Sequence, residues 1–218
     1  MSTVALSVFH PYIALEVTGA SDPLIDQAIT DAAIEFCERS LIWRQKLDPI
    51  QIIANVPDYD VAVPAASMLS DVLDAELASG GWLDPVNLAT TQAERAAVNT
   101  IPPRKGEAAG YLMTDAEEGT LTVDPVPVKS DTLTLIAALK PARGASTLPN
   151  FLYQRWAEAI AAGAKMRLMR IPDKTFSNAN AAMYYQGMFN DRISSAAMRA
   201  ARANTRMPLR STTISKIA

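Results

Sequence analysis

Apolar residues recur at helical spacing near both ends of the chain and at strand spacing in its middle, and this change of period most constrains the fold. In the C-terminal third, apolar side chains stand every four positions: Leu152, Trp156, Ile160, Ala164 and Leu168. That interval places them on one face of an α-helix. The central run Thr132–Leu139 instead contains the alternation of polar and apolar residues that is typical of a strand. Strands grouped together between helices favour an α+β fold over an alternating parallel sheet.

The first helix is predicted from Pro23 to about Gln45. Asp22 can cap the backbone amides at its start, and proline suits the first helical position. Its apolar residues recur at roughly helical spacing: Leu24, Ala28, Ala32, Phe36 and Trp43. Asp48-Pro49 ends this segment, because the residue before a proline is disfavoured in a helix, and Pro49–Val56 is then expected to be a strand.

Short apolar runs separated by turn residues fill residues 57–146 and predict an inserted β-rich subdomain. The expected strands are Val72–Leu77, Trp82–Val86, Gly110–Thr114, Thr120–Asp124 and Thr132–Leu139. The alanine-rich stretch Asn87–Asn99 is either a short helix or an ordered loop. Residues 1–20 lack helical periodicity, which predicts an irregular arm or a short strand.

Two further helices are expected after the β-rich segment, from Leu148 to about Arg170 and from Ser177 or Asn178 to about Ala203. The predicted organisation therefore has four parts: an N-terminal arm, first helix and strand (1–56), the inserted β-rich subdomain (57–146), the C-terminal helices of the same framework (147–203) and an extended basic arm (204–218). In this α+β fold, a helical-bundle framework of one N-terminal and two C-terminal helices carries the insertion and the arm.

Charge is distributed unevenly along the chain. The formal net charge is -3, but residues 1–148 carry 9 basic and 20 acidic residues, whereas residues 149–218 carry 11 basic and 3 acidic residues. An acidic body followed by a basic C-terminal third is typical of a nucleic-acid-binding tail, or of a subunit whose positive end contacts the negative end of a neighbour.

Composition and motifs exclude several classes of protein. The single cysteine, Cys37, cannot form an intramolecular disulfide, and the single histidine, His10, cannot assemble the common zinc sites. Phosphate-binding, dinucleotide-binding, nucleophile-elbow and zinc-protease motifs are all missing from the sequence, so no enzyme activity and no cofactor is expected. The apolar runs are also too short to span a membrane, which needs about 20 residues.

Two groups of residues are candidates for a role in interaction. The cations of the C-terminal region are Arg199, Arg202, Arg206, Arg210 and Lys216. They lie among alanines and methionines without interleaved aromatic residues, which favours an acidic protein surface over DNA phosphates as their partner. The second group is expected in the core or in subunit packing: Phe36, Trp43, Leu152, Trp156 and Ile160.

Several sequence blocks, taken in order, resemble those of tailed-bacteriophage head-tail connector (adaptor or neck) proteins. The N-terminal and central blocks are Ala33–Ser40 with Trp43-Arg44, Leu47–Ile50, Val56–Asp60, and Asp124–Pro127 before Leu139–Pro141. The C-terminal blocks are Pro149–Tyr153, Trp156–Ile160, Gly163-Ala164, Pro172, and a helix through Tyr184 and Phe189. The resemblance covers roughly residues 22–195.

This resemblance implies a virion protein of the phage neck, assembled in the host cytoplasm. Such proteins form a ring, usually of twelve copies, that docks beneath the portal protein, meets a tail or head-completion protein and extends the channel for genomic DNA. The family's C-terminal arm contacts the portal, which assigns that role here to Arg206, Arg210 and Lys216. The alternative is a small DNA-binding protein that uses its basic C-terminal region.

Overall fold

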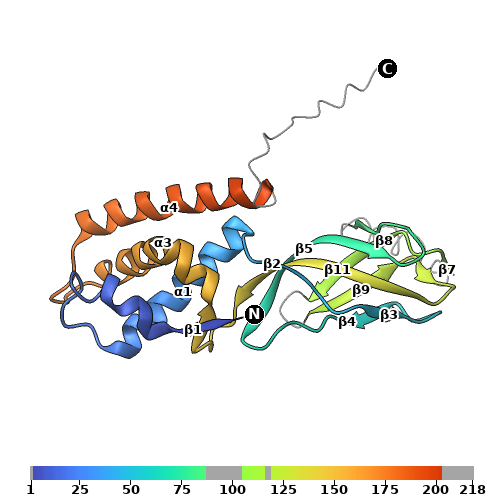
Figure 1. Cartoon of the computed structure of the whole chain (residues 1–218), viewed down its shortest axis with the longest axis horizontal. Helices are drawn as coiled ribbons and strands as arrows, with labels where there is room; N and C mark the ends of the chain where they lie inside the picture. The colour runs from blue at the N-terminus through green and yellow to red at the C-terminus, as the bar shows by residue number, and fades with distance from the viewer. Residues whose placement is uncertain (1, 87–104, 116–118, 203–218) are drawn as a thin grey trace, which may run out of the picture. The chain divides into compact units, whose positions relative to one another are not determined.

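The computed structural model describes residues 2–86, 105–115 and 119–202. The chain divides into two compact units. A helical unit contains the segments before residue 43 and after residue 146, and a β-rich unit contains Trp43–Ser146 (Figure 1). The β-rich unit is thus inserted into the helical one, and the mixed α+β class predicted from the sequence is confirmed.

A short sheet joins the N-terminus of the chain to the segment that follows the insertion. Strand β1 (Thr3–Ala5) pairs antiparallel with β12 (Thr147–Pro149), the strand that follows the insertion. A 3₁₀ helix, η1 (Leu6–Tyr12), follows β1 and buries Leu6 and Phe9. The first twenty residues therefore contain the short strand that was expected, together with a helical turn that the sequence pattern did not indicate.

Helix α1 (Asp22–Ser40) begins with a proline in its first turn, as predicted, but it ends before Gln45. Leu41 adopts a left-handed conformation with φ 49° and donates its backbone amide to the Cys37 carbonyl, which caps the helix. The prediction of a helix as far as Gln45 is therefore wrong. Residues Arg44–Lys46 instead form strand β2 of the other unit.

Helices α3 (Asn150–Met169) and α4 (Ala179–Ala201) follow the insertion and lie near the predicted ranges. The Asn178 side chain accepts a hydrogen bond of 3.0 Å from the Ala181 amide, so α4 begins with a standard N-cap. Helix α3 is interrupted at Trp156, whose φ of -130° and ψ of 15° are not helical. This kink separates the first turns of α3 from its buried second half.

The core of the helical unit lies where α1, α3 and α4 contact one another, as Figure 1 shows for α3 and α4. Gly163 of α3 stands at this junction: a Cβ built there would lie 2.8 Å from Phe189 of α4 and 2.9 Å from Ala32 of α1. Phe36 of α1 contacts the Phe189 ring, with centroids 6.3 Å apart. The missing side chain of Gly163 therefore permits this close approach of three helices.

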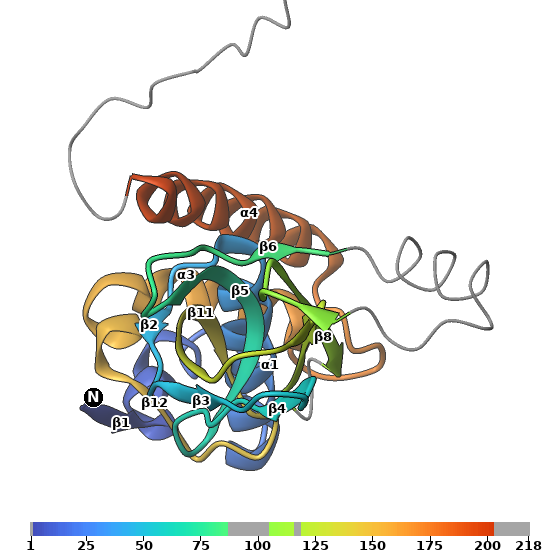
Figure 2. The ribbon, with the colours of Figure 1, turned by 90° about the vertical axis from the view of Figure 1, so that its right-hand side faces the viewer.

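The β-rich unit is organised around the long strand β11 (Asp131–Pro141). Strands β2, β3 (Ile50–Ile52) and β5 (Ser67–Leu77) all pair with β11 in antiparallel orientation. Figure 2 shows β5 and β11 side by side in this unit. The alternating apolar residues of β11 supply its buried face: Leu133, Leu135, Ala137 and Leu139.

A second sheet has the order β4 (Asp58–Asp60), β9 (Thr120–Asp124), β8 (Gly110–Asp115) and β6 (Asp84–Pro85). The β6–β8 pair is parallel and the others are antiparallel. Two short strands, β7 (Lys105–Gly106) and β10 (Val126–Pro127), form a separate parallel pair. The strand expected at Pro49–Val56 is shorter than predicted, because only Ile50–Ile52 pairs with β11.

The unit boundary differs from the expected one at 56/57. Residues 43–56 were assigned to the helical framework, but β2 and β3 pair with β11 and so belong to the β-rich unit. This correction follows from long-range strand pairing, which local periodicity does not encode. The stretch Asn87–Asn99 and the predicted arm 204–218 lie outside the described residues.

Candidate interaction surface

The described residues contain no cluster of three or more histidine, cysteine, aspartate or glutamate side chains able to hold a metal ion. None of the helices in the described ranges is long and apolar enough to cross a membrane. Cys37 is buried in α1, and this burial raises the pKa of its thiol well above the ordinary value. His10 lies 2.7 Å from an Asp26 carboxylate oxygen, a contact that joins η1 to α1. The surroundings of Cys37 and His10 are therefore those of residues with a structural role.

The exposed face of α4 carries large apolar side chains. Met183, Tyr184 and Met198 are 70%, 64% and 51% exposed, respectively. Gly187 lies between them, and a Cβ built there would have no other atom within 4 Å. With 23 residues α4 is about 35 Å long. Large apolar side chains gathered on one exposed helix face mark a surface suited to protein contact.

The predicted C-terminal cations fall partly within the described chain. Arg199 lies in the last turn of α4 and Arg202 is its C-cap residue, and both are exposed. Positive charges at the C-terminal end of a helix also interact favourably with the helix dipole. Arg206, Arg210 and Lys216 lie outside the described residues.

A buried lysine holds α4 against the rest of the unit. Lys165 of α3 is 8% exposed and its Nζ donates to the Glu16 carboxylate at 2.6 Å. The Tyr185 hydroxyl donates to the other oxygen of Glu16, and the Lys165 ammonium lies 4.8 Å from the Tyr185 ring centroid. The bonds from Lys165 and Tyr185 lower the pKa of Glu16, while burial and Glu16 raise the pKa of Tyr185 to about 12.

A second set of polar contacts joins α1, α3 and α4. The Arg167 guanidinium of α3 donates to the Glu35 carboxylate and, at 3.2 Å, to the Asp31 carbonyl, both in α1. Glu35 also pairs with Arg39 at 2.8 Å, and Arg39 donates to Asn190 of α4 at 2.9 Å. Together with Lys165, these residues fix the position of α4 and therefore of its exposed face.

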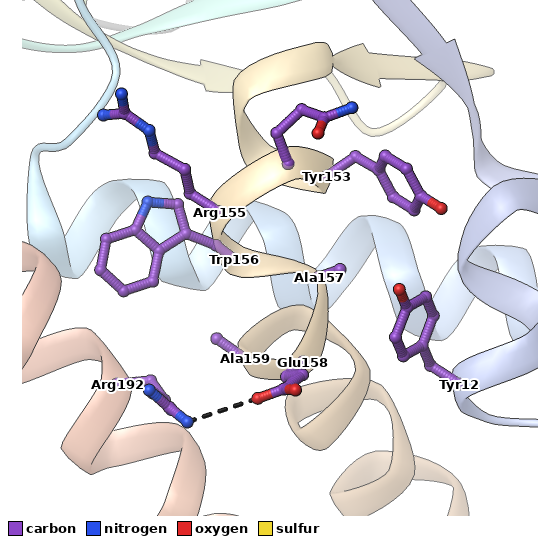
Figure 3. A pocket seen from close by; sticks show the side chains of 9 residues that line it. Tyr12, Tyr153, Arg155, Trp156, Ala157, Glu158, Ala159 and Arg192 are labelled. Carbon is purple, nitrogen blue, oxygen red and sulfur yellow. Dashed lines mark hydrogen bonds and ion pairs between the residues drawn. The ribbon is translucent and has the colours of Figure 1, made fainter.

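A shallow pocket of about 260 Å³ surrounds the kink of α3. It is lined by Tyr12 of η1, residues 153–159 of α3 and Arg192 of α4. Figure 3 shows Tyr12 and Tyr153 on one side of the helix and Trp156 on the other. Arg192 pairs with Glu158 at 3.3 Å, and Tyr153 raises the pKa of Tyr12. The lining thus contains aromatic rings, tyrosine hydroxyl groups, two arginines and one glutamate.

The five residues that the sequence predicts in the core or in subunit packing differ in burial and in the unit to which they belong. Phe36, Leu152 and Ile160 are fully buried in the helical unit. Trp43 is also buried, but it belongs to the β-rich unit and not to the first helix. Trp156 is half-buried, because the kink turns it towards the pocket, and its ring contacts Phe36 with centroids 5.3 Å apart.

Sequence reasoning missed the polar residues that position this surface. Glu16 and Lys165 are 149 residues apart, and no local pattern links them. The only available signal was a lysine and an arginine, Lys165 and Arg167, within an otherwise apolar helical stretch. Buried cations need partners, so their position predicts acidic residues nearby without identifying them.

Comparison with protein families finds a match over most of the chain. A family model described as SU10 adaptor protein matches residues 11–212, which is most of the chain. The chain belongs to the SU10 adaptor protein family. This membership confirms the resemblance to phage head-tail adaptor proteins, and it identifies the chain as a phage structural adaptor and a component of the virion. No curated protein matches the sequence. Membership of this family implies that the chain interacts with other virion proteins.

Proposed function

We propose that this adaptor forms a ring that connects the portal vertex of the phage capsid to the tail and extends the DNA channel. The observation that carries the proposal is the SU10 adaptor match over residues 11–212. Uneven charge supports it, because a subunit with an acidic body and a basic C-terminal third is suited to heterologous contacts between copies. Such head-to-tail contacts close into rings when the rotation between copies permits.

The ring has twelve copies in this proposal and lies at the neck of the virion after assembly in the host cytoplasm. Arg199, Arg202, Arg206, Arg210 and Lys216 contact the portal protein, and the opposite face meets a tail or head-completion protein. The acidic body lines the channel, since negative walls disfavour adhesion of DNA phosphates. Genomic DNA then passes without binding.

The proposal is tested by the mass of the purified chain in solution, measured by light scattering with and without the cognate portal protein. A ring-sized species, formed alone or on the portal, is the expected result. A truncation after Arg202 removes three of the five cations and is expected to weaken portal binding. A chain that remains monomeric and does not bind the portal contradicts the proposal.

The second candidate is a DNA-binding protein, which the basic C-terminal third supports. It predicts a monomer or dimer whose affinity for DNA falls linearly with salt on logarithmic axes. DNA titrations at several salt concentrations, on the same preparation, distinguish the two functions.

A further inference from the structure

The pocket at the α3 kink contains an arginine without a partner. Within the part of the chain that the structure describes, the Arg155 side chain makes no hydrogen bond or ion pair, and it is exposed. The other arginine of the lining, Arg192, is paired with Glu158. Figure 3 shows the Arg155 guanidinium directed away from that pair. The pocket therefore offers a planar set of donors that matches a carboxylate.

The pocket lies at an interruption of helix α3. Trp156 has non-helical φ and ψ angles within this 20-residue helix. Here the Phe36 ring of α1 holds the Trp156 side chain at a centroid distance of 5.3 Å.

The composition of the lining resembles that of protein interfaces. Tyrosine, tryptophan and arginine are the residues enriched at interface hot spots, and Tyr12, Tyr153, Trp156 and Arg155 supply all three types. A protein ligand is therefore favoured over a small metabolite, because the pocket is shallow and its aromatic residues stand around a helix rather than enclosing a cavity.

Charge complementarity identifies the protein that fits. With two arginines and one glutamate, the lining has a net charge of +1. Residues 1–148 of the chain carry 20 acidic against 9 basic residues, so every copy presents many carboxylates on a surface other than this pocket. A contact between unlike surfaces of two copies is heterologous, which is the geometry that a ring needs.

We propose that the α3 pocket accepts an acidic side chain from the neighbouring copy of this chain, with Arg155 as the group that pairs with it. This inference rests on the proposed ring and names one of its contacts. Trp156, on the same side of the helix as Arg155 (Figure 3), provides the apolar side of the site. DNA phosphate is the less favoured ligand, because Glu158 and the acidic body oppose it.

The test compares Arg155→Glu with Lys174→Glu. Lys174 is an exposed cation of the same unit that does not line the pocket, so the two variants change the net charge equally. Assembly is followed by mass photometry across a dilution series, on the full chain with and without portal protein. Arg155→Glu is expected to raise the concentration for half-assembly about tenfold or more, whereas Lys174→Glu changes it by less than about threefold. Arg155→Gln, with a smaller change of charge, serves if the glutamate variant does not fold.

The possible outcomes separate the two proposals. If the wild-type chain forms rings and Arg155→Glu assembles as well as Lys174→Glu, the pocket contact is wrong and the ring stands. If the wild-type chain neither self-associates nor binds the portal, both are wrong. If Arg155→Glu assembles normally but loses DNA affinity with a salt slope smaller by about one, Arg155 contacts phosphate and the inference is overturned.

Discussion

Substitution of Gly163 by alanine tests how tightly the three helices of the adaptor pack. The added Cβ would lie 2.8 Å from the Phe189 ring and 2.9 Å from the Ala32 Cβ, both closer than van der Waals contact. Neither neighbour can easily move away. Ala32 is part of the α1 backbone turn, and Phe189 is 1% exposed and packed against Phe36. The structure must therefore separate α3 from α1 and α4.

Two opposing contributions determine how much Gly163→Ala changes the free energy of unfolding. Overpacking a core costs about 1–3 kcal/mol, whereas replacing glycine by alanine in a helix interior stabilises it by up to about 1 kcal/mol. Gly187 of α4 separates the two terms, because no atom lies within 4 Å of a Cβ built there. Gly187→Ala is therefore expected to stabilise the chain by about 0.5–1 kcal/mol, and Gly163→Ala to be less stable than Gly187→Ala by about 1–3 kcal/mol.

Urea unfolding followed by circular dichroism at 222 nm measures both variants, because this signal reports the helices. The midpoint is expected to fall for Gly163→Ala and to rise for Gly187→Ala, with similar slopes. Equal shifts of the two midpoints would refute the reasoning, since they would mean that the junction accommodates a methyl group without cost. The double variant is expected to show additive changes, because the effect of Gly187 does not depend on the core.

Three further predictions concern residues around the same core. Trp156→Ala is expected to cost about 2 kcal/mol in urea unfolding, less than the loss for a fully buried tryptophan, because Trp156 is half-buried; a loss of about 5 kcal/mol would contradict the observed exposure. Glu16→Gln is expected to lower the free energy of unfolding at pH 7 and to make it depend less on pH in the acid range. Lys165 and Tyr185 lower the pKa of Glu16 in the folded chain. The stabilisation by Glu16 is therefore present above its ordinary pKa of 4.5 and is lost as the pH falls through the lowered pKa. Unfolding midpoints from pH 7 to pH 3 measure this difference, and parallel curves for the two proteins would refute it. Asn178→Ala removes the N-cap of α4 and is expected to lower the unfolding free energy by about 1 kcal/mol. Asn178→Ser is expected to retain most of the stability that the N-cap provides.

Element type was predictable where a local pattern was strong. The four-residue spacing from Leu152 to Leu168 predicted α3, and the alternation in Thr132–Leu139 predicted the central strand. Boundaries were less predictable, because Leu41 ends α1 by adopting a left-handed conformation that leucine rarely takes. The apolar pattern continues to Trp43, but that residue is buried in another unit.

The candidate site was harder to predict than the fold. Local composition points to the C-terminal cations, and three of them lie outside the described residues. It gave no indication of the pocket around Trp156, since Trp156 fits the helical spacing and the kink is visible only in the backbone angles. Tyr12, Arg155 and Arg192 come from η1, α3 and α4, which only the packing of the helices brings together.

The amino-acid sequence by itself determined the α+β class, the order of helices and strands, the uneven charge and the membership of an adaptor family. These properties depend on local periodicity, on residue counts and on the order of sequence blocks. Tertiary structure alone decided that residues 43–56 join the β-rich unit, that Lys165 pairs with Glu16, and that Arg155 stands in a pocket. The physical reason is that strand pairing, burial of charge and helix packing join residues far apart in the chain, and their free energies depend on contacts that no local pattern specifies.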